Sequence, residues 1–223
     1  MSRRRLVLSI AWLLAVALIA TTPVTAGAGR EQIVGFDDWP VDSWIDFGSL
    51  SCPGGKPVSV GPVPSCPEGT RIHIRRAVMW SCVHGLTGTG VPEPRFTGVM
   101  KISLNANFNP DYAGSVWGRW ELALSETCDP SILYSDGPRW EGTWNGKRSQ
   151  VCEGGTCLWL GVLNMVGHGN GGMVDGLQFE GTEMATTFTP VPVPNELIPG
   201  FCLLPDCPPE GTFYGRILTP GND

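Results

Sequence analysis

The stretch from Gly167 to Thr182 constrains the fold of this chain more than any other. It begins with four glycines in six residues and continues as an alternating run, in which Leu177 and Phe179 share one face and Gln178 shares the other with Glu180. Dense glycine marks positive φ, a β-bulge, or backbone that passes close to another group. Alternation with a period of two is typical of a strand with one buried face. The stretch therefore predicts a glycine-rich turn followed by a strand of an antiparallel sheet.

The same alternation recurs along the chain and is clearest at residues 95–108. There the apolar positions are Met100, Ile102, Leu104, Ala106 and Phe108. Asn109-Pro110-Asp111 then predicts a turn, since proline cannot donate to a ladder and Asn and Asp favour turns. A return strand at 115–125 places Trp120, Leu122 and Leu124 on one face. The two strands are predicted to form a hairpin.

Further strands are expected at 71–80, 139–148, 158–166 and 212–218, and a short strand could form at 33–36 within the irregular extension. In the first of these, Ile72, Ile74, Val78 and Trp80 are predicted to share one face. The 30 glycines and 20 prolines suit a turn-rich all-β fold. The predicted fold is an antiparallel seven- or eight-stranded up-and-down β-barrel, with a β-sandwich as the alternative; closure into a barrel would remove the edge strands.

Residues 1–26 have the three parts of a secretory signal peptide: Arg3, Arg4 and Arg5, an apolar core at 6–20, and small residues ending at Ala26. The core is shorter than the roughly 20 residues of a membrane span. Cleavage would remove three arginines and no acid, so the net charge would change from −6 to −9. An acidic exported chain is a poor candidate for binding nucleic acid or, after cleavage, an anionic membrane. We expect a secreted protein, extracellular or periplasmic.

After the signal peptide, the sequence predicts an irregular, Pro/Gly-rich, disulfide-held extension at 27–70. A β-barrel-like domain is expected at 71–223, and a Pro-rich stretch at 189–210 interrupts it.

All eight cysteines lie in the exported part: Cys52, Cys66, Cys82, Cys128, Cys152, Cys157, Cys202 and Cys207. An even number in an oxidising compartment predicts four disulfides. Short loops favour the pairs Cys152–Cys157, Cys202–Cys207 and Cys52–Cys66, which leaves Cys82 with Cys128, although many other pairings are open. The spacing required for zinc is missing, so no metal is expected.

Three motifs carry a resemblance: Val116-Trp117-Gly118-Arg119-Trp120, Trp140-Glu141-Gly142-Thr143-Trp144-Asn145-Gly146, and Gly167–Gly172 followed by Asp175-Gly176-Leu177. Together they resemble a group of secreted bacterial β-proteins of uncharacterised function, which are distantly similar to the barrel of allene oxide cyclase and dirigent proteins. The resemblance covers about residues 95–185 and implies a β-barrel. It implies no catalytic residue, because the motifs are Trp and Gly spacings.

His168 is the first acid–base candidate, because flanking glycines would present it on an accessible loop. Asp175 or Glu180 could orient it, as a general base requires. The simpler interpretation is that the glycines serve the turn and His168 is an ordinary exposed side chain.

The polar strand faces give a second hypothesis. Arg119, Glu121, Glu141, Lys147, Gln178 and Glu180 would form a ligand-binding pocket if they faced a barrel lumen. They would be solvated cross-strand pairs if they faced water, which is favoured because small barrels fill their interior with side chains. The tryptophans Trp117, Trp120, Trp140, Trp144 and Trp159 could stack on a sugar, but packing over facing glycines in the core is favoured.

The sequence therefore favours a secreted small-ligand-binding or structural domain over an enzyme. The expected ligand is a small apolar or carbohydrate molecule, and no cofactor is expected. The alternatives are a lumen-based cyclase- or isomerase-like enzyme that uses His168, Asp175 and Glu180, and an extracellular protein-interaction module.

Overall fold

The computed structural model of the chain describes residues 30–38, 44–46, 48–55, 58–60, 63–67, 69–153, 156–190 and 211–219. The predicted signal peptide at 1–26, most of the Pro-rich stretch at 189–210, and Cys202 with Cys207 lie outside the described residues.

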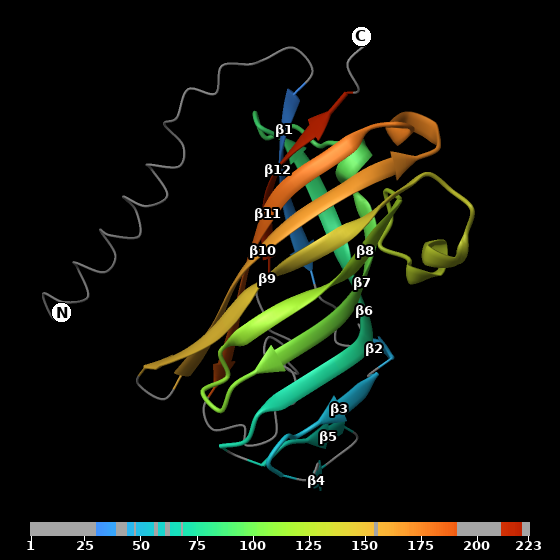
Figure 1. The fold of residues 1–223 in the computed structure, drawn as a ribbon. Coiled ribbons are helices and arrows are strands. Elements are labelled where there is room, and N and C mark those ends of the chain that lie inside the picture. The colour runs from blue at the N-terminus through green and yellow to red at the C-terminus, as the bar shows by residue number, and fades with distance from the viewer. Residues whose placement is uncertain are drawn as a thin grey trace, which may run out of the picture.

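Eight antiparallel strands form a closed barrel (Figure 1). They are β1 (Arg30–Asp38), β6 (Ile72–Thr87), β7 (Gly98–Phe108), β8 (Gly114–Leu124), β9 (Arg139–Glu153), β10 (Thr156–Asn170), β11 (Gln178–Pro190) and β12 (Gly211–Leu218). Strands β6 to β12 pair in chain order, and β1 closes the barrel by pairing with both β12 and β6. The predicted eight-stranded barrel is confirmed, and the sandwich alternative is wrong.

The part of the chain before residue 71 contributes more to the barrel than the sequence predicted. The segment Arg30–Asp38 was assigned to the irregular extension, but it is β1 and closes the barrel. Strands β2 (Trp44–Asp46) and β3 (Ser49–Ser51) pair with the first half of β6, before the part that pairs with β1. Strands β4 (Val58–Val60) and β5 (Val63–Ser65) form a separate two-stranded sheet. These short strands gather at one end of the barrel (Figure 1).

A bulge in β6 reverses which side chains face the interior. The register to β7 shifts between Ile74 and Ala77, and Arg76 adopts a φ of 58°. Ile72, Ile74 and Ala77 are buried inside, so the inward positions change from even to odd numbers. The prediction that Val78 and Trp80 share the face of Ile72 is therefore wrong.

Aromatic side chains fill one end of the barrel. Phe96, Trp120, Trp140, Phe179 and Phe213 are all at most 2% exposed. Phe96 comes from the short helical turn η1 (Pro94–Phe96) and contacts all four other rings, stacking on Phe179 with centroids 4.4 Å apart. It acts as a plug held by the loop between β6 and β7.

An ion-pair cluster fixes this plug to the barrel wall. Arg95 binds Glu93 at 2.7 Å and also pairs with Glu31 of β1. Glu93 is 4% exposed and accepts the Arg95 backbone N–H at 3.0 Å. The hydrogen bond from the Arg95 guanidinium lowers the pKa of Glu93 and outweighs the opposing effect of burial.

Glycines make room for the large rings. Trp120, Gly142, Gly167 and Phe179 form one direct register row across four strands. A Cβ on Gly142 or on Gly167 would lie 2.5 Å from the Trp120 ring. The core interpretation of Trp120, Trp140 and Trp144 is confirmed, since each is at most 5% exposed.

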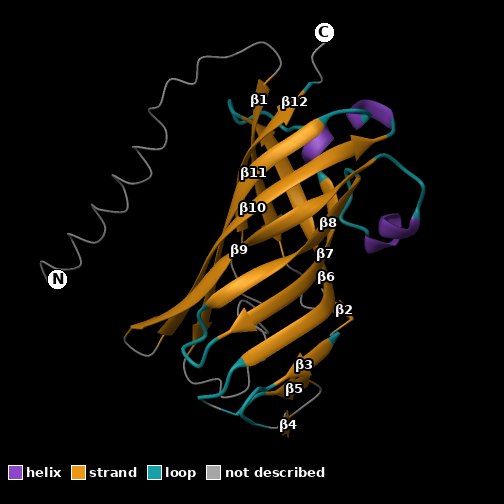
Figure 2. Ribbon diagram, viewed as in Figure 1, coloured by secondary structure: helices purple, strands orange, loops and turns teal. Residues whose placement is uncertain are grey.

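The glycine-rich run also forms the predicted turn. Gly171 and Gly172 have φ values of 74° and 55°, in the left-handed region that favours glycine. They lead into η3 (Gly172–Val174), one of the short helical turns seen near the barrel end in Figure 2. Among the described residues, no helix has the length and apolar character needed to cross a membrane.

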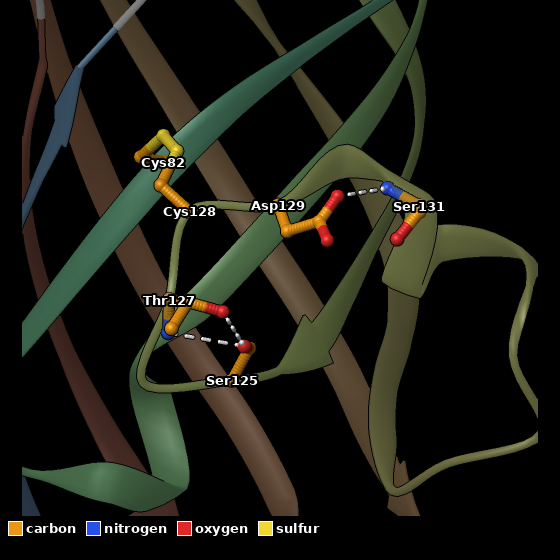
Figure 3. The surroundings of a disulfide bond; sticks show 6 residues. All are labelled: Cys82, Ser125, Thr127, Cys128, Asp129 and Ser131. Atoms are coloured by element: carbon orange, nitrogen blue, oxygen red, sulfur yellow. Dashed lines mark hydrogen bonds between the residues drawn. A yellow bond between two sulfur atoms is a disulfide. The ribbon is translucent and has the colours of Figure 1, made fainter.

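Two of the expected disulfides are confirmed: Cys52–Cys66 and Cys82–Cys128. The second joins β6 to the loop that carries η2 (Pro130–Tyr134), as Figure 3 shows. Leu133 of this loop forms a small apolar cluster with Val99 and Ala123 on the outside of the barrel.

The cysteines of the β9–β10 hairpin are compatible with a third predicted disulfide. Cys152 and Cys157 are direct partners in the register of this hairpin. Their side chains lie outside the described residues, so this pairing stays a prediction.

Candidate functional site

Predicted site residues line up on the outside of the barrel, not in its lumen. His168 on β10 is the direct cross-strand partner of Glu141 on β9 and of Gln178 on β11. Glu141 is in turn the direct partner of Glu121 on β8. We call these four residues the polar row. His168, Glu141 and Gln178 are exposed and Glu121 is half-buried, so the solvated interpretation describes their position.

His168 differs from its expected setting. It lies within strand β10 rather than on a loop, because the flanking Gly167 and Gly169 belong to the strand. A Cβ on Gly169 would lie 2.0 Å from the Val174 carbonyl oxygen, so this glycine serves a close backbone approach. The predicted loop position of His168 is therefore wrong.

The two carboxylates expected beside His168 have different positions. Asp175 accepts the Gly171 backbone N–H at 3.0 Å and so stabilises the turn. Glu180 pairs with Val166, which places it diagonally from His168 on the outer face. The direct carboxylate neighbour is Glu141, which sequence reasoning placed in a different group.

Cations gather at one end of the polar row. Glu121 pairs with Arg139 and, at 3.7 Å, with Lys101. These contacts offset the like-charge opposition between Glu121 and Glu141. Arg119 is exposed two residues before Glu121, and Lys147 is exposed on β9 opposite Val162. The polar row and the cations beside it can thus offer donors, acceptors and the His168 imidazole to a partner at the surface.

Two tryptophans of the predicted set are not part of the described core. Trp117 is half-buried on the outer face, where the Arg75 guanidinium lies 5.3 Å from its ring centroid. The side chain of Trp159 lies outside the described residues.

The barrel interior holds a polar group that the sequence analysis did not select. Asp37 of β1 and Glu183 of β11 are 0% and 3% exposed. Asp37 shares one face of β1 with the buried Ile33, and Glu183 shares one face of β11 with the buried Phe179, so both acids lie on the inner face. They flank Gly211 of β12, and we call Asp37 and Glu183 the inner acids.

The inner acids converge on one point of the wall. A Cβ on Gly211 would lie 2.0 Å from Asp37 Oδ1 and 2.9 Å from Glu183 Oε1. Only glycine leaves this space to the two carboxylates.

Two further polar atoms lie in the interior. Ser81 of β6 is diagonal to Asp37 on the neighbouring strand, and its hydroxyl is buried with no hydrogen-bond partner in the described part of the chain. The Trp144 indole N–H on β9 is also buried with no hydrogen-bond partner in the described part of the chain. Strand β9 lies across the barrel from β1 in the order of the strands. By contrast, Trp120 donates to the Val166 carbonyl at 3.1 Å.

A sequence signal for the inner acids existed. Glu183 continues the odd-numbered face of Leu177 and Phe179, and Asp37 continues the face of Ile33. An acid on an apolar face is the informative exception in a strand pattern.

No protein-family model, curated protein or solved structure matches this chain. The resemblance to the allene oxide cyclase and dirigent barrel therefore stays a prediction. Within the described ranges, no group of three or more His, Cys, Asp and Glu side chains could hold a metal ion.

Proposed function

We propose that this chain is a secreted small-ligand-binding barrel whose ligand contacts the inner acids. The observation that carries this proposal is the burial of Asp37 and Glu183 side by side on the inner wall. Taking a carboxylate out of water costs several kcal/mol unless donors or cations surround it. Apolar side chains at both strand positions would avoid that cost, so an acid buried at each of them marks a candidate functional site.

The chemistry of the interior selects a ligand rich in hydrogen-bond donors. Carboxylates accept hydrogen bonds from hydroxyl or ammonium groups. The Ser81 hydroxyl can donate or accept, and the Trp144 indole N–H can donate to a ligand oxygen. A small hydroxylated molecule of carbohydrate type supplies both kinds of group. A purely apolar ligand would offer no hydrogen-bond partner to the Ser81 hydroxyl or the Trp144 indole N–H.

Export is part of this proposal. The two disulfides are consistent with an oxidising extracellular environment. The N-terminal pattern at 1–26 supports passage through the secretory route.

The enzyme alternative has less support. His168 is exposed on the outer face, and the Asp175 carboxylate binds backbone at the turn. The inner acids lie on the other side of the wall from His168, so the two sets cannot act on one substrate atom.

A ligand screen by thermal shift tests the proposal. The disulfide-intact protein is heated with a panel of neutral mono- and oligosaccharides, aliphatic amines and fatty acids. We expect saccharides to raise Tm, because a ligand that binds only the folded state stabilises it. The response should disappear in Glu183→Gln and persist in Glu126→Gln, a matched change at an exposed loop position. A panel without a saccharide response, or an equal response in Glu183→Gln, would overturn the proposal.

A further inference from the structure

The outer face of β1, β10, β11 and β12 carries an uncharged surface. One direct register row runs through Val162, Met184, Thr212 and Phe36, and the next runs through Asn164, Thr182, Tyr214 and Val34. Val162, Met184, Phe36 and Tyr214 are 53%, 38%, 37% and 46% exposed. We call these two rows the neutral face.

Large apolar side chains seldom form a contiguous patch on the surface of a monomeric protein. Single exposed apolar residues need no explanation, but a contiguous patch marks an interaction site. The four exposed side chains come from four adjacent strands, so they share one continuous surface.

The charge distribution limits what can bind there. The chain carries a net charge of −6, yet none of the eight residues of the neutral face is charged. An acidic or basic partner would find no complementary charge within the two rows; among the described side chains, the nearest charges are Lys147, opposite Val162 on β9, and the pair of Glu180 and Arg216. A second copy of the chain would be repelled by acidic surface elsewhere but not here.

The row next to the neutral face is self-complementary. Glu180 on β11 and Arg216 on β12 are direct cross-strand partners on this outer surface. A two-fold axis brings the same patch of two subunits together, so two residues that lie on either side of the axis on one copy contact each other's equivalents on the other copy. Glu180 of one copy can then meet Arg216 of the other.

We infer that the neutral face is an interface between two copies of this chain related by a two-fold axis. Four strands and two residue rows, with the flanking charged row, cover a patch of about 20 Å by 15 Å. This is small for a stable interface, so the dimer should be weak and concentration-dependent. The inference rests on the outer surface alone and is independent of the proposed ligand site.

Sedimentation velocity over a micromolar concentration series tests the inference on the disulfide-intact protein. We expect the wild type to shift from monomer to dimer as its concentration rises. Met184→Glu should remain monomeric at every concentration, because it buries a carboxylate in the uncharged contact, against Thr212 of the other copy. Met173→Glu is the matched control, since Met173 is 58% exposed on η3 away from the neutral face and should leave dimerisation unchanged.

Charge exchange supplies an independent check. Glu180→Arg and Arg216→Glu should each weaken the dimer about tenfold or more, and the double exchange should restore it, because the complement is then reversed on both copies. Circular dichroism confirms that each variant is folded; if Met184→Glu does not fold, Val162→Glu takes its place. A monomeric wild type at all concentrations, a dimer that tolerates the glutamate, or a double exchange that restores nothing would overturn the inference.

Discussion

The fit of Trp120 over two glycines makes a quantitative prediction about stability. The ring is 2% exposed, its N–H donates to the Val166 carbonyl, and it meets Phe179 edge-on at 5.7 Å. Trp120→Ala should lower the free energy of unfolding by about 3–5 kcal/mol, since the glycines below it have no side chains to fill the cavity. At about 2–4 °C per kcal/mol for a chain of this size, Tm should fall by about 10 °C.

A double-mutant cycle with Gly167→Ala tests the mechanism rather than the size of the effect. In the wild type the new Cβ would lie 2.5 Å from Trp120 Cζ2, so overpacking should cost about 1–3 kcal/mol. In the Trp120→Ala background the ring is gone, and the same change should cost less by about 1 kcal/mol or more. The remaining close contact is with the Glu141 carbonyl oxygen at 2.9 Å.

Guanidinium unfolding followed by far-UV circular dichroism measures all four proteins with their disulfides intact. Trp117→Ala is the control on the same strand, because Trp117 lies on the outer face and loses mainly its contact with Arg75, worth about 0.5–1 kcal/mol. Additive costs for Trp120→Ala and Gly167→Ala, or a Trp120→Ala protein as stable as the Trp117→Ala control, would refute the reasoning.

Three further predictions follow from single contacts. Because the pKa of Glu93 is lowered in the folded protein, its carboxylate stabilises the fold at pH values above the ordinary glutamate range, and this contribution is lost as the pH falls through the lowered pKa. Glu93→Gln should therefore make Tm fall less steeply as the pH is lowered. An unchanged fall of Tm in acid would contradict this. Paired replacement of Cys82 and Cys128 by serine should cost about 2–4 kcal/mol in chemical unfolding. Trp144→Phe should cost less than Trp120→Phe in the same assay, because only the Trp120 N–H has a partner in the described part of the chain.

Strand positions and faces could be predicted because alternation is a local property. The apolar set from Met100 to Phe108 is buried as expected, and the Asn109 side chain accepts the N–H groups of Asp111 and Ala113 in the predicted turn. Of the two disulfides seen, Cys52–Cys66 was expected from its short loop, and Cys82–Cys128 was the pair that remained.

The errors arise where one residue or one distant partner decides the outcome. Arg76 inserts a bulge that reverses the inward face of β6, and no alternation rule announces it. Only a short strand at 33–36 was expected where β1 runs, and its place in the barrel was missed because its partners β6 and β12 are distant in the chain.

The candidate site illustrates the same limit. Sequence reasoning collected polar residues by strand and assumed that a site would use the polar faces. The structure places those faces outside, with His168 beside Glu141, and leaves Asp37 and Glu183 as acids on the apolar faces. Their convergence on Gly211 requires β1, β11 and β12 to be neighbours, which only barrel closure provides.

Closure therefore creates both proposed binding surfaces at once. Because β1 fills the gap between β12 and β6, its inner face brings Asp37 to Gly211 while its outer face brings Phe36 beside Thr212. Phe36 and Asp37 are consecutive, and a strand directs consecutive side chains to opposite faces. A shift of β1 by one residue would exchange them, exposing the acid and burying the ring. The register of this one strand thus sets the position of the inner acids and of the neutral face.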